Sequence, residues 1–404
     1  MILFHTADWH IGQHFFGYDR KEEHLVFFEW LKTEIREHRP DALLIAGDVF
    51  DSPNPSAESQ KIFYRLLKEI TGEMPELQVV MIAGNHDSAA RLEAPDPLFR
   101  EMNISVKGSV KRNNAGEIIW ESLLVPLKKD GQIAAWCIAV PYLRQGDYPS
   151  AETYSQCVAA SYEACCRELD KIRKTGQPVI AMGHLQATGS EISENDRSER
   201  TVIGGLESVS PEAFDRREIK YTALGHLHKA QRVSGREHVR YAGSPLPMSF
   251  AEKNYKQGIN KITLKDNDLD KIERLVFVPP VSLLSIPDRP QPLSAVLQEI
   301  ATLPDGPADS RSPYLELKVS VTGPEPALRY RIEEALKEKA VRLTRIVSFA
   351  PGKSNHETES ITYEELQAMT PLKMAEDVYL DRYGDPMPEN LRKLLLHVIR
   401  DVEL

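Results

Sequence analysis

The sequence predicts an α/β fold, followed by a small α+β domain and C-terminal helices. Three observations predict it: apolar strand-like runs alternate with amphipathic stretches in the N-terminal part, a second alternation follows residue 280, and 404 residues exceed one ordinary domain. Apolar residues make up 41% and charged residues 27% of the chain, which is the balance of a water-soluble globular protein.

The N-terminal elements follow from hydrophobic periodicity. Short apolar runs at residues 2–6, 42–46 and 79–83 predict buried strands. Residues 19–38 carry apolar side chains at helical spacing, and a second helix is expected to begin after the capping residue Ser56. Strands and helices therefore alternate from the start of the chain.

The pattern changes over residues 105–143, where the turn sequence at residues 113–116 separates β-type runs and predicts antiparallel sheet. A long helix is expected near residues 151–174. Further strands are expected at residues 179–182, 221–224, 238–242, 258–264 and 272–278.

We expect four parts along the chain. A first domain spans residues 1–279 and ends at Pro279-Pro280, and residues 280–349 form a small β-α-β-α-β unit. A linker at 350–360 precedes two helices within 361–404. The last helix has an apolar stripe that fits core packing and docking on a partner coiled coil equally well. The stripe consists of Leu391, Leu394, Leu395, Val398 and Val402.

Charge and composition limit the classes of function. Sixty acidic residues against 50 basic ones give a net charge of −10, which argues against tight binding of DNA by the chain alone. Cys137, Cys157, Cys165 and Cys166 show no C-x-x-C pairing, so neither a disulfide nor a zinc site is expected. No apolar run reaches the roughly 18 residues of a spanning helix, and the first residues lack a signal peptide's basic region. We expect a cytoplasmic protein.

Five polar clusters each follow a predicted strand, which is where α/β sheets bind ligands. They are Asp8-Trp9-His10, Gly47-Asp48-Val49-Phe50-Asp51, Gly84-Asn85-His86-Asp87, Gly183-His184 and Gly225-His226-Leu227-His228. Glycine precedes the polar residue in four of them, which suits a close approach of backbone and side chain to an ion. One such cluster is more often an ordinary polar turn, but five in this arrangement indicate a functional site.

The residue types in these clusters predict a metal centre. Carboxylate, amide and imidazole donors without thiolates fit Mn²⁺, Fe²⁺ or Zn²⁺ better than Ca²⁺ or Mg²⁺. The candidate ligands are therefore the carboxylate, amide and imidazole groups of these five clusters. Two dications about 4 Å apart repel each other and need an anion between them, and Asp48 is the candidate bridge.

The series D-x-H, G-D-x-x-D, G-N-H-D, G-H and G-H-x-H resembles the calcineurin-like metallophosphoesterases. Within them, the spellings DWHIGQ, GDVFD, GNHD and GHLH are similar to the SbcD nuclease subunits of bacterial SbcCD complexes. The resemblance covers residues 1 to about 280 with every motif intact, and extends more loosely through residues 189–205 and the C-terminal part. It implies a β-sandwich flanked by helices, with residues 280–349 as a capping domain.

The resemblance also implies the role of each site residue. Asp8, His10, Asp48 and His228 would hold one metal, and Asp48, Asn85, His184 and His226 the other, with two Mn²⁺ ions as the expected cofactors. His86 would be the protonated imidazole that meets the scissile phosphate or the leaving oxygen, oriented by Asp51. For Asp87 a role in the site and a role as a turn-capping carboxylate both stay open.

The implied function is that of a DNA double-strand exonuclease and single-strand or hairpin endonuclease in DNA end processing, replication, repair and recombination. The implied partners are DNA and an SMC-like ATPase, SbcC, with a homodimer of this chain inside a heterotetramer. Two alternatives are a phosphatase or cyclic-nucleotide phosphodiesterase on the same scaffold, and a scaffold protein without chemistry. The second alternative would have lost metal ligands, whereas here every ligand position is filled.

Overall fold

The computed structural model describes residues 1–191, 208–321, 325 and 327–349, with isolated residues between 372 and 395. The chain divides into two compact units, Met1–Val319 with Glu325–Ser348, and Ser320–Pro324 with Phe349–Leu404. The loop at 192–205, the linker at 350–360 and the helices within 361–404 fall outside the described residues, apart from those isolated positions. The description below concerns the first unit.

Two six-stranded sheets form the core of the first unit. The first sheet has the order β14 (Asp268–Val276), β13 (Gly258–Lys265), β1 (Ile2–Thr6), β4 (Ala42–Ala46), β5 (Gln78–Ile82), β6 (Ile104–Lys107). Strands β1, β4, β5 and β6 run parallel, while β13 and β14 are antiparallel to their neighbours. This sheet therefore carries three of the predicted polar clusters at one edge.

The second sheet has the order β11 (Gln231–Val233), β12 (Arg236–Tyr241), β10 (Ile219–Gly225), β9 (Val179–His184), β8 (Gln132–Ala139), β7 (Leu124–Lys129). Its four central strands are parallel, and its two edge strands are antiparallel to their neighbours. The clusters that contain His184 and His226 follow β9 and β10.

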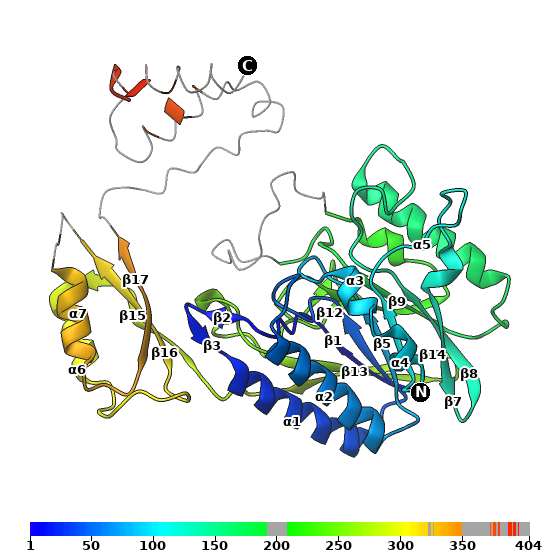
Figure 1. Ribbon diagram of the computed structural model, residues 1–404, viewed down its shortest axis with the longest axis horizontal. Helices are drawn as coiled ribbons and strands as arrows, with labels where there is room; N and C mark the ends of the chain where they lie inside the picture. Colours follow the sequence, from blue (N-terminus) through cyan, green and yellow to red (C-terminus); the bar gives the residue numbers. More distant parts are fainter. Residues whose placement is uncertain are drawn as a thin grey trace. The chain divides into compact units, whose positions relative to one another are not determined.

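The two sheets pack face to face and helices cover their outer faces, which confirms the predicted β-sandwich flanked by helices. Alternate residues of each strand face opposite layers: Leu44 of β4 joins the core between the sheets, while Leu43 packs beneath the helices. Helices α1 (Lys21–His38) and α2 (Ala57–Glu73) lie side by side on the first sheet (Figure 1), and α5 (Tyr154–Asp170) covers the second. The side chain of Ser56 accepts a hydrogen bond from Ser59 N, which confirms the predicted cap of α2.

A smaller sheet follows residue 280. It has the order β15 (Leu283–Pro292), β16 (Tyr314–Ser320), β17 (Arg342–Phe349), with α6 (Leu293–Ala301) and α7 (Leu328–Leu336) in the two connections. The β-α-β-α-β succession is the predicted one. Its Tyr314 is fully buried, and the hydroxyl donates a hydrogen bond to Glu23 of α1 at 2.8 Å.

The prediction of antiparallel sheet throughout residues 105–143 was wrong. Strand β6 extends the parallel sheet beside β5, and Trp120 begins a short 3₁₀ helix, Trp120–Leu123. Within residues 105–143, β7 and β8 form an antiparallel pair, and a single antiparallel bridge joins Arg112 to Ile118 across the predicted turn. Two short helices, α3 (Ala89–Glu93) and α4 (Asp96–Arg100), were missed because five residues are too few to show a helical period.

All four cysteines are free and buried, as expected. Burial raises the pKa of the Cys166 thiol to about 11, so this group stays protonated at neutral pH. Within the described residues, no helix combines the length and the hydrophobicity that crossing a bilayer requires.

Candidate metal centre

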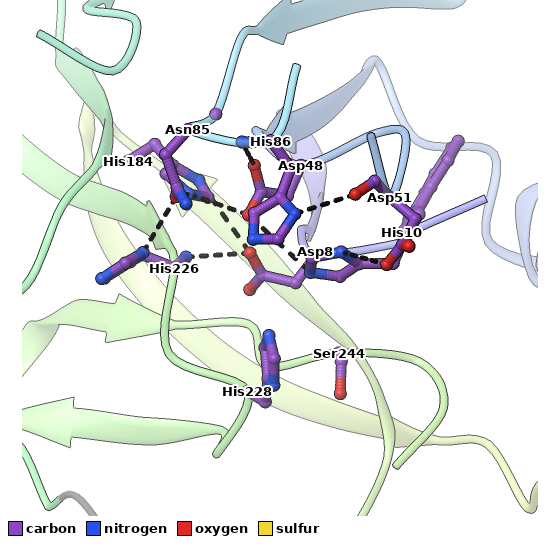
Figure 2. Close-up of polar contacts among 12 residues, drawn as sticks. Asp8, His10, Asp48, Asp51, Asn85, His86, His184, His226, His228 and Ser244 are labelled. Atoms are coloured by element: carbon purple, nitrogen blue, oxygen red, sulfur yellow. Dashed lines mark hydrogen bonds and ion pairs between the residues drawn. The ribbon is translucent and has the colours of Figure 1, made fainter. Parts of the chain in front are cut away.

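The polar clusters meet at the carboxyl ends of parallel strands from both sheets. Asp8 follows β1, Asp48 follows β4 and Asn85 follows β5, while His184 ends β9 and His226 follows β10. Because the two sheets pack face to face, these strand ends point to one place (Figure 2). Residues far apart in sequence are thereby brought within a few ångströms of one another.

Several of these residues have a left-handed backbone conformation that residues other than glycine rarely adopt. The φ angles are 54° at Asp8, 46° at His10, 48° at Asp48 and 102° at His226. Such conformations cost on the order of 1–3 kcal/mol each and persist only where the surrounding structure holds them. Here the backbone N–H of Asp8 donates to Gly47 O, and that of His10 donates to Asp48 O, both at 3.0 Å. Their clustering at one spot marks a functional site.

One half of the site surrounds His184. Its Nε2 lies 2.9 Å from Asn85 Oδ1 and 3.3 Å from Asp48 Oδ2. Its Nδ1 donates to the carbonyl oxygen of Ala46 at 2.9 Å, which leaves Nε2 as the nitrogen that faces the site. His226 Nδ1 lies 3.1 Å from the same Asn85 oxygen, and its backbone N–H donates to Asp8 Oδ1 at 2.9 Å.

The other half contains His10 and His228, whose ring centroids are 5.2 Å apart. His10 Nε2 lies 3.7 Å from Asp48 Oδ2. His228 Nδ1 lies 3.2 Å from Glu252 Oε1, so its other nitrogen is the one available to an ion. Asp48 therefore lies between the two halves, which is the position expected of a bridging ligand (Figure 2).

Burial dominates the electrostatics of these groups. Burial disfavours the charged form of a group. It therefore raises the pKa of the Asp8 carboxyl to about 7 and lowers the pKa of the His226 imidazole to about 3. Burial acts in the same way on His184, but the neighbouring Asp48 carboxylate outweighs it and raises the pKa of His184 to about 9. In return, burial of Asp48 is overcome by the His184 charge, which holds the pKa of Asp48 well below its usual range. Burial thus disfavours the ionised form of both carboxylates, and the charge of His184 counteracts burial fully only at Asp48.

These residues fit a pair of divalent metal ions. Asp8 Oδ2 and His10 Nε2 are buried without a hydrogen-bond partner, and a buried polar atom without a partner is costly unless something else binds it. Ligand atoms of Asp8, Asp48 and His184 lie within 4.8 Å of one another, as do those of His10, Asp48 and His86. The donors are oxygen and imidazole nitrogen, a set typical of Mn²⁺, Fe²⁺ and Zn²⁺.

The structure corrects the expected contact between Asp51 and His86. His86 Nδ1 donates to the backbone carbonyl oxygen of Asp51 at 2.9 Å, whereas the Asp51 carboxylate lies 3.3 Å from His10 Nδ1. The expected carboxylate–imidazole pair at His86 is therefore wrong, because the turn after β4 directs the carbonyl rather than the side chain toward His86. Asp51 contacts both histidines, by different atoms.

Asp87 takes the turn-capping role that the sequence left open. Its buried carboxylate accepts hydrogen bonds from the backbone N–H groups of Val49, Phe50 and Gly84 at 2.9 to 3.2 Å. It thereby ties the loop after β4 to the loop after β5. The relative position of Asp48 and Asn85 depends on this tie.

The glycines that precede the ligands permit very close packing. A Cβ on Gly84 would lie 2.1 Å from Asp48 Oδ1, and one on Gly225 would lie 1.9 Å from Ala46 O. Real Cβ atoms essentially never approach so closely, so only glycine fits at these two positions. The glycines therefore allow the loops to pack closely against one another, while the expected approach to an ion stays a prediction.

The aromatic residues beside the first cluster mostly pack in the protein interior. Trp9 is fully buried against Phe28, with ring centroids 5.3 Å apart, and Phe15 is buried beside Phe250. Phe16 is 45% exposed. The exposed His14 lies on the small hairpin of β2 (His14–Phe15) and β3 (Tyr18–Asp19) and contacts no ligand residue among the described contacts.

Three residues close to the site were not predicted. Glu252 is buried and holds His228, while Tyr142 and Arg144 lie beside His184 and Asp87. None of them belongs to a recognisable motif. Tyr142 does stand at the end of residues 105–143, which were predicted to form sheet, so its position at the end of that segment was the available signal.

Comparisons with known proteins agree with this geometry. The family model of calcineurin-like phosphoesterases matches residues 1–230, and that of the type 5 capsule protein repressor C-terminal domain matches residues 279–383. The SbcD subunit of the nuclease SbcCD from Rhodobacter capsulatus is 36% identical over 367 residues, which cover 87% of this chain and 88% of the relative. The corresponding protein of Escherichia coli strain K12 is 32% identical over 286 residues, 68% of each chain, and that of Bacillus subtilis is 29% identical over 277 residues, 66% of this chain and 67% of the relative. The chain therefore belongs to the calcineurin-like phosphoesterases, which bind divalent metals, and within them to the family of SbcD subunits of the nuclease SbcCD.

Proposed function

We propose that this chain hydrolyses phosphodiester bonds of DNA, as an exonuclease on double-stranded ends and an endonuclease on single strands and hairpins. The observation that carries the proposal is the convergence of ligand-type side chains from both sheets around Asp48. The relatives are named as subunits of the nuclease SbcCD, and these names support the choice of DNA over other phosphodiesters.

Two ions would be held with Asp48 as the shared ligand. Asp8, His10 and His228 would complete one set, and Asn85, His184 and His226 the other. We propose Mn²⁺ because imidazole and oxygen donors are mixed in both sets. When bound, such a pair lowers the pKa of water and neutralises charge that develops on phosphate oxygens.

His86 would supply the proton that the leaving oxygen needs when the P–O bond breaks. A carbonyl oxygen only accepts, so its contact with His86 Nδ1 requires a proton on that nitrogen and leaves Nε2 to face the substrate. The backbone N–H of His86 donates to Asp48 Oδ1 at 2.9 Å, which fixes the imidazole relative to the metal site. In this proposal His86 acts as a general acid, with the donated proton on Nε2, and does not bind a metal.

We further propose that the chain acts in the cytoplasm with an SMC-like ATPase, SbcC, as a homodimer within a heterotetramer. In this proposal residues 280–349 restrict which DNA ends or hairpins reach the metals. The C-terminal helices expected within 361–404 would dock on the ATPase. Truncation after Ala350 should abolish co-purification of the ATPase while hydrolysis of a small phosphodiester persists. Unchanged co-purification would refute the docking role.

Metal analysis and a nuclease assay test the central proposal. The purified chain should carry close to two divalent ions and should cleave linear and hairpin duplexes in Mn²⁺, faster with the partner ATPase and ATP. A scaffold protein would carry far fewer ions. A phosphatase or cyclic-nucleotide phosphodiesterase would turn over phosphomonoesters or cyclic nucleotides and leave DNA intact, and that result would overturn the nuclease proposal.

A further inference from the structure

Two side chains at the rim of the metal centre have no role in the chemistry described so far. Tyr142 and Arg144 lie in the segment between β8 and α5. The backbone N–H of Tyr142 donates to Ala83 O at 2.8 Å, which ties this segment to the residue directly before the Gly84-Asn85 turn. The two side chains are therefore positioned by the same turn that carries Asn85 and His86.

The Tyr142 ring lies against a metal-ligand residue. Its centroid is 6.2 Å from that of His184, with the rings edge to face at 78°. The ring is half-buried, so one part of it packs on the site and the rest faces solvent.

Arg144 is exposed, yet its guanidinium turns back toward the site. Nη2 donates to the backbone carbonyl of Asp87 at 3.3 Å, and the guanidinium carbon lies 5.4 Å from the Tyr142 ring centroid. Within the described part of the chain, no ion pair joins this guanidinium to a carboxylate, whereas Arg236, for example, pairs with Asp215. Most of its five N–H donors are therefore left for a ligand.

We propose that Tyr142 and Arg144 form a subsite for the nucleotide next to the scissile phosphate. The Arg144 guanidinium binds the adjacent phosphate, and the Tyr142 ring packs on the sugar or base between the two phosphates. Among the described contacts, Arg144 reaches Asp87 and Tyr142 but none of the proposed metal ligands, which favours a neighbouring phosphate over the one that reacts. This inference rests on the proposed function, because only a polynucleotide supplies a second phosphate.

The chain's charge makes a local subsite necessary. A protein with a net charge of −10 repels a polyanion at long range, so DNA must be held near the metals by particular cations. An unpaired guanidinium next to His86 meets that need. Such a subsite would favour a polymer over a small diester, since the small diester would contact the metals alone.

The test compares two substrates in saturating Mn²⁺: a single-stranded oligonucleotide and bis(p-nitrophenyl) phosphate. For Arg144→Gln, we expect the ratio of kcat/KM on the oligonucleotide to kcat/KM on the small diester to fall about tenfold, mainly through KM. The slope of log KM against the logarithm of the salt concentration should decrease by the amount that corresponds to about one phosphate contact. Tyr142→Leu should lower the ratio by a smaller factor, and Arg144→Lys should recover part of it.

Arg112→Gln is the matched control. Arg112 is also an exposed arginine, and it ties the turn at Gly116 to the same segment by donating to the carbonyls of Gly116 and Gly146. An unchanged ratio in Arg144→Gln, or an equal fall in Arg112→Gln, would overturn the subsite, because either result leaves only an effect on the loop. Failure of the proposed function looks different: the wild-type chain would cleave the small diester and no DNA.

Discussion

Replacement of Gly84 by alanine tests how the metal centre is built. A Cβ at this position would lie 2.1 Å from Asp48 Oδ1 and 2.4 Å from Asp48 N, whereas ordinary contact begins at 3.4 Å. The Asp48 carboxylate would have to move by about 1.3 Å to reach that separation. Metal sites tolerate deviations of about 0.2 Å in ligand distance, so the displacement is several times too large. Because Asp48 is the proposed shared ligand, we expect the binding of both ions to be affected.

For Gly84→Ala we expect fewer than one ion per chain after dialysis and a fall in kcat/KM of at least about a hundredfold. Metal content is measured by elemental analysis, and turnover with bis(p-nitrophenyl) phosphate over a range of Mn²⁺ concentrations. Overpacking also costs roughly 1–3 kcal/mol of stability, which a thermal melt separates from loss of metal.

Gly72→Ala provides the matched control for the same chemical change. Gly72 is exposed in α2, and a Cβ there meets nothing within 4 Å. This variant should be as active as the wild type and up to about 1 kcal/mol more stable. If Gly84→Ala keeps two ions and stays within about twofold of Gly72→Ala in kcat/KM, the inference that backbone proximity positions Asp48 is wrong.

Three further predictions follow from the contacts described above. His86→Ala should keep both ions yet lose turnover by about 100-fold or more, and wild-type cleavage of DNA in saturating Mn²⁺ would exclude a general acid at this position. Glu252→Gln should weaken Mn²⁺ binding about 10- to 100-fold in calorimetric titration, because Glu252 orients His228; unchanged affinity would remove that role. Burial lowers the pKa of His5 in the folded protein to about 3. In the unfolded chain His5 takes up a proton below about pH 6.5, whereas in the folded protein it stays neutral there. Stability is therefore complete above pH 6.5 and falls as the pH drops, by up to about 1.4 kcal/mol per unit, and His5→Phe should flatten that slope in urea titrations of the metal-free protein.

Hydrophobic patterns predicted most of the core because buried positions are apolar and follow the period of their own strand or helix. The strand at residues 42–46 is apolar throughout since both its faces are covered, and Ser56 caps α2 through its own neighbour Ser59. Whether a strand pairs parallel or antiparallel with its neighbour does not change this pattern. Residues 104–107 look the same whether they lie beside β5 or form a hairpin, and the structure places them parallel to β5.

The candidate ligands were predictable because they stand together in short clusters after strands. Glu252 was not, since a buried carboxylate at the end of a short turn reads as an ordinary surface residue until His228 is placed against it. Asp51 shows a second limit. Its presence beside His86 was expected, but the choice between carboxylate and carbonyl depends on the rotation of one turn.

The carbonyl oxygen of Ala46 links the two sheets beside the proposed metal centre. It accepts a hydrogen bond from His184 Nδ1 of the opposite sheet, and a Cβ on Gly225 would collide with it. Main-chain atoms of β4 and β10 thus determine the spacing of the residues that would hold the ions, and main-chain positions depend little on which side chains surround them. Substitutions elsewhere in the sandwich core can therefore change how stable the protein is while the catalytic spacing stays the same.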